Sequence, residues 1–224
     1  MISPKYASTH YYHSAKALAK HATFPNVVNL YLDYNCVFSA RIFGKILQVV
    51  PELEKKHPGQ FQFVFVDVIQ PWHPNSVLLH EYALVVAQLL KESAEEPNKS
   101  FWAVSGTLFK NIEQFYDSET VTLGRNDIYK AINDLVYSEN DLPFAKEKVL
   151  ERLQIQVPTD TTEKSKQSRH TGNGATVDVK YFTKYLRGVG VHVTPTVSVN
   201  GIVDNSISSG NSVEELIKTF EGYL

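Results

Sequence analysis

Hydrophobic and polar positions divide the chain into segments with two different periods. Residues 27–34 and 61–69 are largely apolar runs, rich in β-branched and aromatic side chains, and each predicts a strand buried in a sheet. Between them, apolar side chains recur at spacings of mostly three and four, which predicts a helix: Phe38, Ile42, Phe43, Ile46, Leu47 and Val50. Pro51 interrupts this pattern, and residues 52–56 continue it after a kink. Strand, helix and strand together predict a βαβ unit with parallel strands.

The middle of the chain is helical in pattern. Residues 76–155 carry no convincing strand, and Ser76 can cap the first helix. Three more helices are predicted, over 100–116, from 126 or 127 to 136, and over 142–153. Residues 156–178 are polar and rich in Thr, Ser, Lys and Gly, which predicts a loop that is partly helical at most. Four helices between strand-bearing segments predict an inserted helical subdomain.

The C-terminal part returns to strands. A helix is predicted over 179–187, followed by strands over 191–199 and 202–207 that are joined by the hairpin dipeptide Asn200-Gly201. Ser212 opens the last helix as one half of a capping box. The predicted order of elements is therefore β-α-β, a helical insertion, and then α-β-β-α.

These patterns predict the organisation of the whole chain. It divides into an N-terminal arm over 1–25, a strand-bearing domain made of 26–75 and 174–224, a helical subdomain over 76–155 and a loop over 156–173. In the arm, His10 and His13 flank two tyrosines. A metal site there is not favoured because no further ligands cluster nearby, and the arm is interpreted as a cover for part of the sheet.

Composition narrows the classes of function. Of the 224 residues, 43% are hydrophobic and 21% are charged, which is ordinary for a globular protein. The formal net charge of −2 and the pI near 6.4 give no electrostatic footprint for nucleic acid or an anionic membrane. No apolar run approaches the ~20 residues that span a bilayer, and residues 1–21 lack the pattern of a secretory signal. A single cysteine agrees with a reducing compartment, so we expect a cytoplasmic protein without nucleic-acid or membrane partners.

The single cysteine, Cys36, lies where the first predicted strand meets the first long helix. Unpaired backbone N–H groups and the positive end of the helix dipole favour a thiolate there. Position 39, where a second cysteine would complete Cys-x-x-Cys, is Ser39. After the second strand, two prolines hold Trp72 and His73 in an extended loop at the sheet edge where α/β proteins build sites. Trp72 is interpreted mainly as a packing residue, and His73 as either a titrating group near the site or an ordinary loop histidine.

Three features resemble the DsbA-like branch of the thioredoxin superfamily. They are the order of elements, Cys36 at the first strand–helix junction, and the run Val193-Thr-Pro-Thr-Val197. The resemblance covers residues 26–73 and 174–222. It implies an α/β fold with a thioredoxin-like βαβ…αββα core and a helical insertion. It also implies that Cys36 is the nucleophilic thiol and that the Thr194–Pro195 bond is cis. The backbone of Thr194 would then face the sulfur and bind an extended peptide or glutathione.

Ser39 departs from the dithiol pattern of this branch. A dithiol oxidase releases its substrate with a second cysteine, so a single thiol excludes disulfide oxidation by this chain alone. A monothiol reaction remains, in which Cys36 forms a mixed disulfide with glutathione and a second glutathione regenerates the thiol. Ser39, one helical turn on, would donate a hydrogen bond to the thiolate. The candidate residues for binding substrate or glutathione are Phe38, Trp72, His73, Thr194, Pro195 and Ser212.

Ser212 has two interpretations. Its main role is expected to be that of a helix cap, and the helix N-terminus that it opens could also hold a carboxylate of glutathione.

Two other functions stay open. Kappa-type glutathione transferases resemble the same branch and carry serine rather than cysteine in this loop, which implies that Ser39 or Cys36 would stabilise the thiolate of bound glutathione. Alternatively, the fold is a non-catalytic thioredoxin-like binding scaffold in which Cys36 is a small buried hydrophobe. We expect no bound cofactor and no metal. The expected partners are glutathione, as a co-substrate, or a thiol or disulfide peptide.

Overall fold

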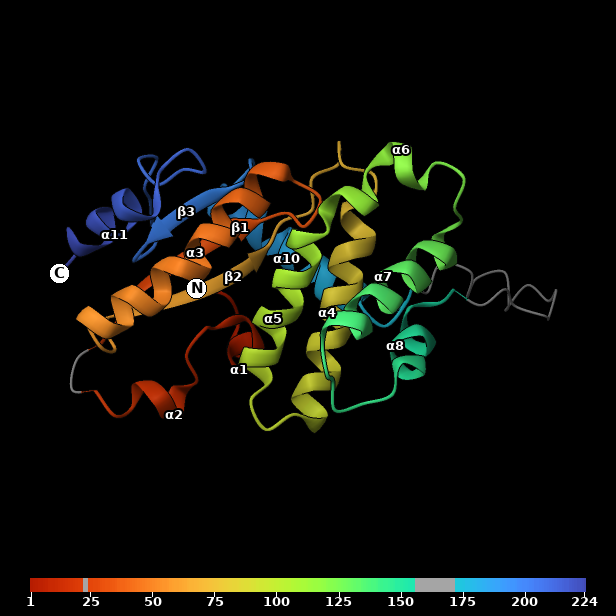
Figure 1. Cartoon of the computed structure of the whole chain (residues 1–224), viewed down its shortest axis with the longest axis horizontal. Coiled ribbons are helices and arrows are strands. Elements are labelled where there is room, and N and C mark those ends of the chain that lie inside the picture. Colours follow the sequence, from red (N-terminus) through yellow and green to blue (C-terminus); the bar gives the residue numbers. More distant parts are fainter. Residues whose placement is uncertain (22–23, 156–171) are drawn as a thin grey trace.

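Four strands form one mixed sheet, which lies in the left half of the molecule as Figure 1 shows it. They are β1 (Asn26–Leu32), β2 (Phe61–Asp67), β3 (Thr196–Val199) and β4 (Ile202–Val203), in the order β2-β1-β3-β4. β1 pairs parallel with β2 and antiparallel with β3, and β3 pairs antiparallel with β4. The structure is a computed structural model, and it describes residues 1–21, 24–155 and 172–224. The two largely apolar runs of the sequence thus form the parallel pair of strands, β1 and β2.

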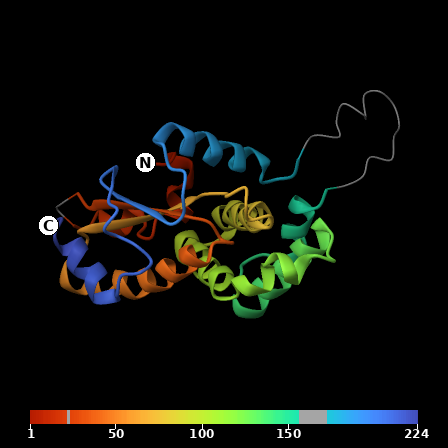
Figure 2. The same ribbon diagram turned by 90° about the horizontal axis from the view of Figure 1, so that it is seen from above.

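Helices cover both faces of the sheet, as Figure 2 shows. On one face lie α3 (Val37–Lys56) and α11 (Val213–Glu221), and on the other lie α10 (Thr176–Val189) and the beginning of the N-terminal arm. The arm consists of η1 (Pro4–Tyr6), α1 (Ala7–His10) and α2 (Ala15–Leu18). Its connecting segment lies along β2, where Tyr11 forms a bridge with Val64 and the Tyr12 amide donates to the Phe63 carbonyl at 2.9 Å.

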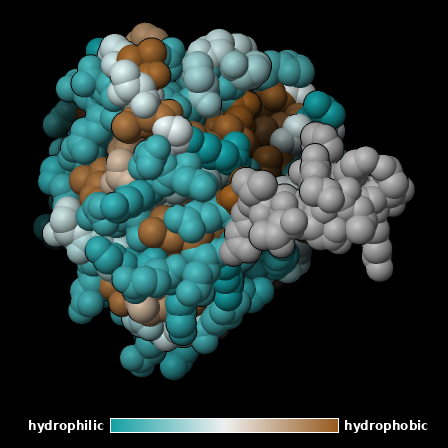
Figure 3. Space-filling model, turned by 90° about the vertical axis from the view of Figure 1, so that its right-hand side faces the viewer, coloured by the Kyte–Doolittle hydropathy of each residue, from teal (hydrophilic) through white to brown (hydrophobic). Residues whose placement is uncertain are grey.

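The helical insertion follows β2 and lies at one end of the sheet (Figure 1). It contains α4 (Ser76–Ser93), α5 (Pro97–Lys110), η2 (Ile112–Phe115), α6 (Asp117–Thr120), α7 (Arg125–Glu139) and α8 (Lys146–Leu153). The surface at this end is mostly hydrophilic, with hydrophobic patches between the polar side chains (Figure 3). Among the described residues, no helix has the length and apolar character needed to cross a membrane.

An aromatic cluster joins the sheet to the insertion. Phe65 on β2 is fully buried at its centre. Five rings lie around it, with centroids 5.1 to 6.4 Å from that of Phe65: Tyr34, Phe43, Phe101, Trp102 and Phe109. They belong to the loop after β1, to α3 and to α5, so the sheet and the insertion share one hydrophobic core.

Several boundaries differ from those predicted by the sequence. Pro51 lies inside α3, which runs on to Lys56 as one helix rather than two pieces. β3 starts only at Thr196, because Pro195 before it has no N–H to donate to a neighbouring strand. β4 ends at Val203, where Asp204 turns the chain by accepting a hydrogen bond from the Ser206 amide at 2.8 Å.

The helices of the insertion also shift relative to the prediction. α5 begins at Pro97, a residue well suited to a first helical turn, and ends at Lys110 before the separate short helix η2. α8 begins at Lys146 rather than at Leu142, since Pro143 keeps the residue before it out of the helical conformation. The loop predicted over 156–178 falls mostly outside the described residues, and its last part belongs to α10.

Candidate active site

Cys36 is the N-cap residue of α3. Its side chain is buried, with 4% of its surface exposed, and its Sγ lies 3.6 Å from the carbonyl oxygen of Thr194, to which the thiol donates. The Thr194–Pro195 peptide bond is cis. Antiparallel pairing of β1 with β3, which places Tyr31 opposite Thr196, brings these two segments together although they are 158 positions apart. The structure therefore brings the predicted thiol and the predicted Thr194–Pro195 segment into contact.

Asp33 organises the loop that carries Cys36. Its carboxylate is fully buried. Oδ1 accepts hydrogen bonds from the Asn35 amide at 2.8 Å and the Ser76 hydroxyl at 2.7 Å. Oδ2 accepts from His73 Nδ1 at 2.7 Å and from the Gln70 amide at 3.3 Å. One carboxylate thus ties the thiol loop to the loop after β2, and His73 is part of this connection.

Ser39 supports the same loop. It is fully buried, and its Oγ accepts a hydrogen bond from the Asp33 amide at 3.2 Å. Asp33 also accepts, through its backbone carbonyl, the amide hydrogen of Cys36 at 3.0 Å. The hydroxyl of Ser39 therefore holds the residue on which the Cys36 backbone rests, and a donor role of Ser39 toward the thiolate stays a prediction.

A second buried carboxylate lies behind Asp33. His80 on α4 donates from Nδ1 to Asp67 Oδ1 at 2.7 Å, and its Nε2 lies 3.6 Å from Asp33 Oδ1. Burial lowers the pKa of His80, but its contacts with both carboxylates and their charges outweigh this and raise the pKa to about 9. The pKa of Asp67 falls to about 2, because hydrogen bonds from His10 and His80 and their charges outweigh the effect of burial.

Two groups compete for Nε2 of His80. The Tyr34 amide lies 3.3 Å from this atom and can donate to it only if the ring is neutral. A charged ring would instead face Asp33 Oδ1 with its Nε2 proton, across 3.6 Å, as an ion pair. We assign the charged form, because a neutral His80 would leave two buried carboxylates without a cation between them.

The sequence did not reveal this group of residues. Asp33, Asp67, His80 and His10 come from four separate segments, and the arm was interpreted only as a cover for the sheet. Two signals could have suggested the group. Asp33 and Asp67 each stand at the carboxyl end of an apolar run, and His80 interrupts the apolar stretch of α4.

Exposed apolar side chains surround the entrance to the thiol. Val37, Phe38 and Trp72 are 37%, 50% and 60% exposed. The packing role expected for Trp72 is therefore wrong, because a loop fixed between two prolines holds its ring in solvent. A cavity of about 360 Å³ adjoins the two neighbours of Cys36, and it is lined by Asn35, Val37, Trp72, His73, Tyr116, Asp117 and Ser118.

Ser212 is not brought to the thiol. It forms the predicted capping box, in which its Oγ accepts from the Glu215 amide at 3.2 Å and Glu215 accepts from its amide at 2.8 Å. Next to it, the Asn211 carbonyl accepts from Lys45 on α3. Lys45 stands nine residues after Cys36, which corresponds to roughly 13 Å along the helix. Ser212 thus acts as a helix cap at a distance from the site.

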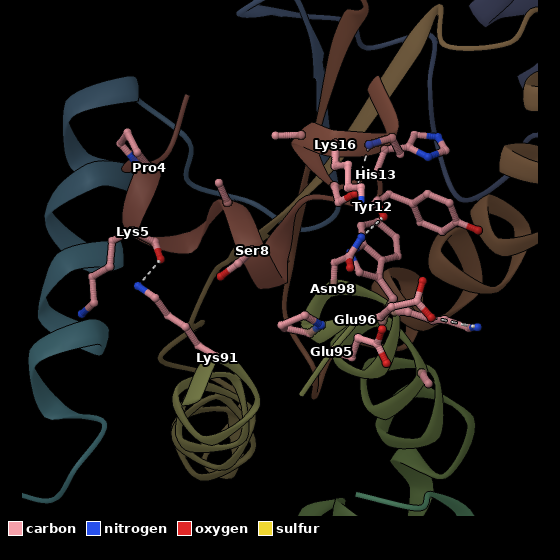
Figure 4. A pocket seen from close by; sticks show the side chains of 18 of the residues that line it. Pro4, Lys5, Ser8, Tyr12, His13, Lys16, Lys91, Glu95, Glu96 and Asn98 are labelled. Carbon is pink, nitrogen blue, oxygen red and sulfur yellow. Dashed lines mark hydrogen bonds and ion pairs between the residues drawn. The ribbon is translucent and has the colours of Figure 1, made fainter. Parts of the chain in front are cut away.

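A larger cavity lies elsewhere in the described structure (Figure 4). It measures about 1120 Å³ and separates the N-terminal arm from the ends of α4 and α5. Figure 4 shows Lys91 and Asn98 reaching the arm, where they donate to the carbonyls of Lys5 and Tyr12. Trp102 also lines this cavity, and its buried indole N–H has no hydrogen-bond partner among the described residues. Cys36 is not among the lining residues, so the cavity and the thiol site are separate features.

Comparisons with known proteins agree with this architecture. No protein-family model and no curated protein sequence matches the chain. Among solved structures, a proposed protein-disulfide isomerase from Pseudomonas syringae superposes with a TM-score of 0.62 at 22% identity, covering 88% of this chain and 93% of its own. BdbD from Bacillus subtilis, in its oxidised form, gives 0.57 at 19% identity, with 99% and 94% covered. MdbA from Corynebacterium diphtheriae, a thiol-disulfide oxidoreductase, gives 0.55 at 16% identity, with 95% and 89% covered. The chain therefore has the DsbA-like thioredoxin fold with a helical insertion, as its sequence predicted.

Proposed function

We propose that this protein catalyses thiol–disulfide exchange with Cys36 as its only reacting thiol and glutathione as the second thiol. The observation that carries the proposal is the position of Cys36 Sγ, at the N-terminus of α3 and against the Thr194 carbonyl. The free amides of a first helical turn stabilise a negative charge on sulfur. Proteins with the same fold include the thiol-disulfide oxidoreductase MdbA.

The reaction balances with one protein thiol. The Cys36 thiolate attacks the glutathione sulfur of a mixed disulfide, R–S–S–G, forms Cys36–S–S–G and releases R–S⁻, which takes up a proton. A second glutathione thiolate then attacks the glutathione sulfur bound to Cys36. The products are oxidised glutathione and the regenerated Cys36 thiolate. The net reaction converts R–S–S–G and one glutathione into R–SH and one glutathione disulfide.

Two features of the surroundings of Cys36 bear on how a substrate approaches the thiol. Because Cys36 is 4% exposed, a disulfide reaches its sulfur by displacing the contact with the Thr194 carbonyl. The exposed rings of Phe38 and Trp72 provide apolar surface for the part of the substrate that does not react. Ser39, by contrast, is buried against the Asp33 amide, which does not favour the transferase alternative in which its hydroxyl binds the thiolate of glutathione.

The test compares wild type with Cys36→Ser in reduction of a peptide–glutathione mixed disulfide by glutathione. Glutathione disulfide is followed by its coupled reduction. We expect the catalysed rate to fall by about a thousandfold or more in Cys36→Ser, because the nucleophile is lost. Ser138→Ala changes an exposed serine on α7 and is the matched control that keeps the wild-type rate.

Two results would contradict the proposal. One is a wild-type rate equal to that of the uncatalysed exchange. The other is conjugation of glutathione to an electrophile such as 1-chloro-2,4-dinitrobenzene that survives in Cys36→Ser, which would favour the transferase alternative instead.

A further inference from the structure

A chain of four buried ionisable side chains connects the N-terminal arm with the thiol loop. The four residues belong to α1, the end of β2, α4 and the loop after β1, and each is fully buried: His10, Asp67, His80 and Asp33. His10 Nε2 donates to Asp67 Oδ2 at 2.9 Å, and His80 Nδ1 donates to Asp67 Oδ1 at 2.7 Å. The chain closes at Asp33 Oδ1, 3.6 Å from His80 Nε2.

The members of this chain depend on one another. Two carboxylates without solvent need cationic or hydrogen-bonding partners, and His80 is shared between them. Among the described residues, the other side chain that donates to Asp67 is His10. If that donor is lost, the negative charge of Asp67 draws the His80 proton and ring toward itself and away from Asp33.

Asp33, the last of the four buried residues, is connected to the thiol through the backbone. The Asp33 carbonyl accepts the amide hydrogen of Cys36 at 3.0 Å, and the Asp33 carboxylate fixes the Asn35 amide between them. A displaced or less well compensated Asp33 would therefore move the thiol loop and bring uncompensated negative charge closer to the sulfur. Negative charge near a thiol disfavours the thiolate.

We propose that His10 and Asp67 are positioning residues for Cys36: they hold His80 against Asp33 and thereby set how readily the thiol ionises and reacts. This inference rests on the proposed function, since it concerns the same thiol. The N-terminal arm would then influence the chemistry of the thiol although none of its own atoms reacts.

The experiment measures the rate of Cys36 alkylation by iodoacetamide against pH in three variants. His10→Phe keeps an aromatic ring against Phe101 and Phe182, whose centroids lie 4.4 and 5.4 Å from that of His10, but it removes the donor to Asp67. His10→Gln keeps an N–H in the place of Nε2. Tyr6→Phe is the matched control. It removes a different contact of the same arm, the hydroxyl that donates to Asp178 at 2.8 Å, and leaves the four buried ionisable residues unchanged.

We expect the alkylation profile of His10→Phe to move to higher pH, with a rate at pH 7 about threefold or more below wild type. His10→Gln and Tyr6→Phe should stay within about 1.5-fold of wild type, because both retain a donor to Asp67. Equal rates in His10→Phe and Tyr6→Phe would show that His10 acts only as an anchor of the arm, and would overturn the proposal.

Other charged groups near the thiol are the same in all of these variants. His73, Tyr116 and Asp117 line the cavity beside the neighbours of Cys36, and Tyr116 in turn lies within reach of the charges of Glu113 and Arg41. His192 stands two positions before Thr194 in the sequence. Around His80 itself lie Tyr34 and the two carboxylates. A shift confined to His10→Phe is therefore assigned to the buried chain.

A fourth variant covers the case in which His10→Phe does not fold. Thr9 Oγ1 lies 2.8 Å from His10 Nδ1, and Thr9→Val removes this hydroxyl with little change in shape. A smaller shift to higher pH supports the proposal, and an unchanged profile overturns it. Alkylation needs no exchange partner, so the two proposals fail separately. Exchange activity with an unchanged His10→Phe profile overturns the coupling alone, whereas a shifted profile without exchange activity overturns the function alone.

Discussion

Replacing His80 with leucine is expected to lower the free energy of unfolding by about 3–5 kcal/mol at pH 7, because it leaves two buried carboxylates without their shared cation. His80 is fully buried between Asp33 and Asp67. Leucine fills a similar volume, so the loss measures the charge and its hydrogen bonds more than the packing. Urea denaturation followed by circular dichroism gives the value.

The same substitution at His57 is the control. His57 lies 3.1 Å from Glu221 at the surface, with about a third of its side chain exposed, and a surface ion pair contributes about 1 kcal/mol at most. A His80→Leu variant as stable as His57→Leu would contradict a charged His80 within this group of residues.

The pH dependence of stability follows from the same residue. The pKa of His80 rises from 6.5 to about 9 in the folded protein, so its contribution is complete below pH 6.5 and is lost as the pH rises through 9. The pKa of Asp67 falls from 3.8 to about 2, so its contribution is present above pH 3.8 and is lost as the pH falls through 2. Wild type should therefore lose stability between pH 6.5 and 9, and His80→Leu should lack this alkaline decline.

Phe65→Ala is expected to cost about 3–5 kcal/mol, since it opens a cavity at the centre of the aromatic cluster. Phe65 is fully buried and contacts rings from α3 and α5. Because this cluster belongs to both the sheet and the insertion, both should unfold together at a lower urea concentration. Phe38→Ala is the control, because Phe38 is 50% exposed and its loss should cost less than about 1 kcal/mol. Separate transitions of sheet and insertion, or equal losses in both variants, would contradict a shared core.

Much of the fold could be predicted because its central elements have a local cause. The apolar runs that become β1 and β2 are continuous in the sequence, and the apolar side chains of α3 recur at spacings of three and four within one stretch. The position of Cys36 follows directly from the boundary between two such elements. Strand lengths after Pro195 were less predictable, since they depend on which backbone groups find a partner across the sheet.

The buried group of residues around the thiol could not be predicted in this way. Periodicity indicates which side of an element faces inward, but not which polar side chain of another element meets it there. His10 and Asp67 are 57 positions apart and lie in segments with no pattern in common. Ser39 is a second example. Its sequence position places it one helical turn after Cys36, but does not reveal that its hydroxyl accepts a hydrogen bond from the Asp33 amide.

The pairing of the arm with β2 has a consequence for the behaviour of the protein in concentrated solution. β2 is an outer strand of the sheet, and the Tyr11–Val64 bridge and the Tyr12 amide occupy part of its free edge. An uncovered edge of apolar residues is a template for pairing with another molecule. A variant that lacks residues 1–14 would present this edge to neighbouring molecules, and light scattering should then detect self-association. We therefore expect the arm to limit pairing between copies of the protein at this edge.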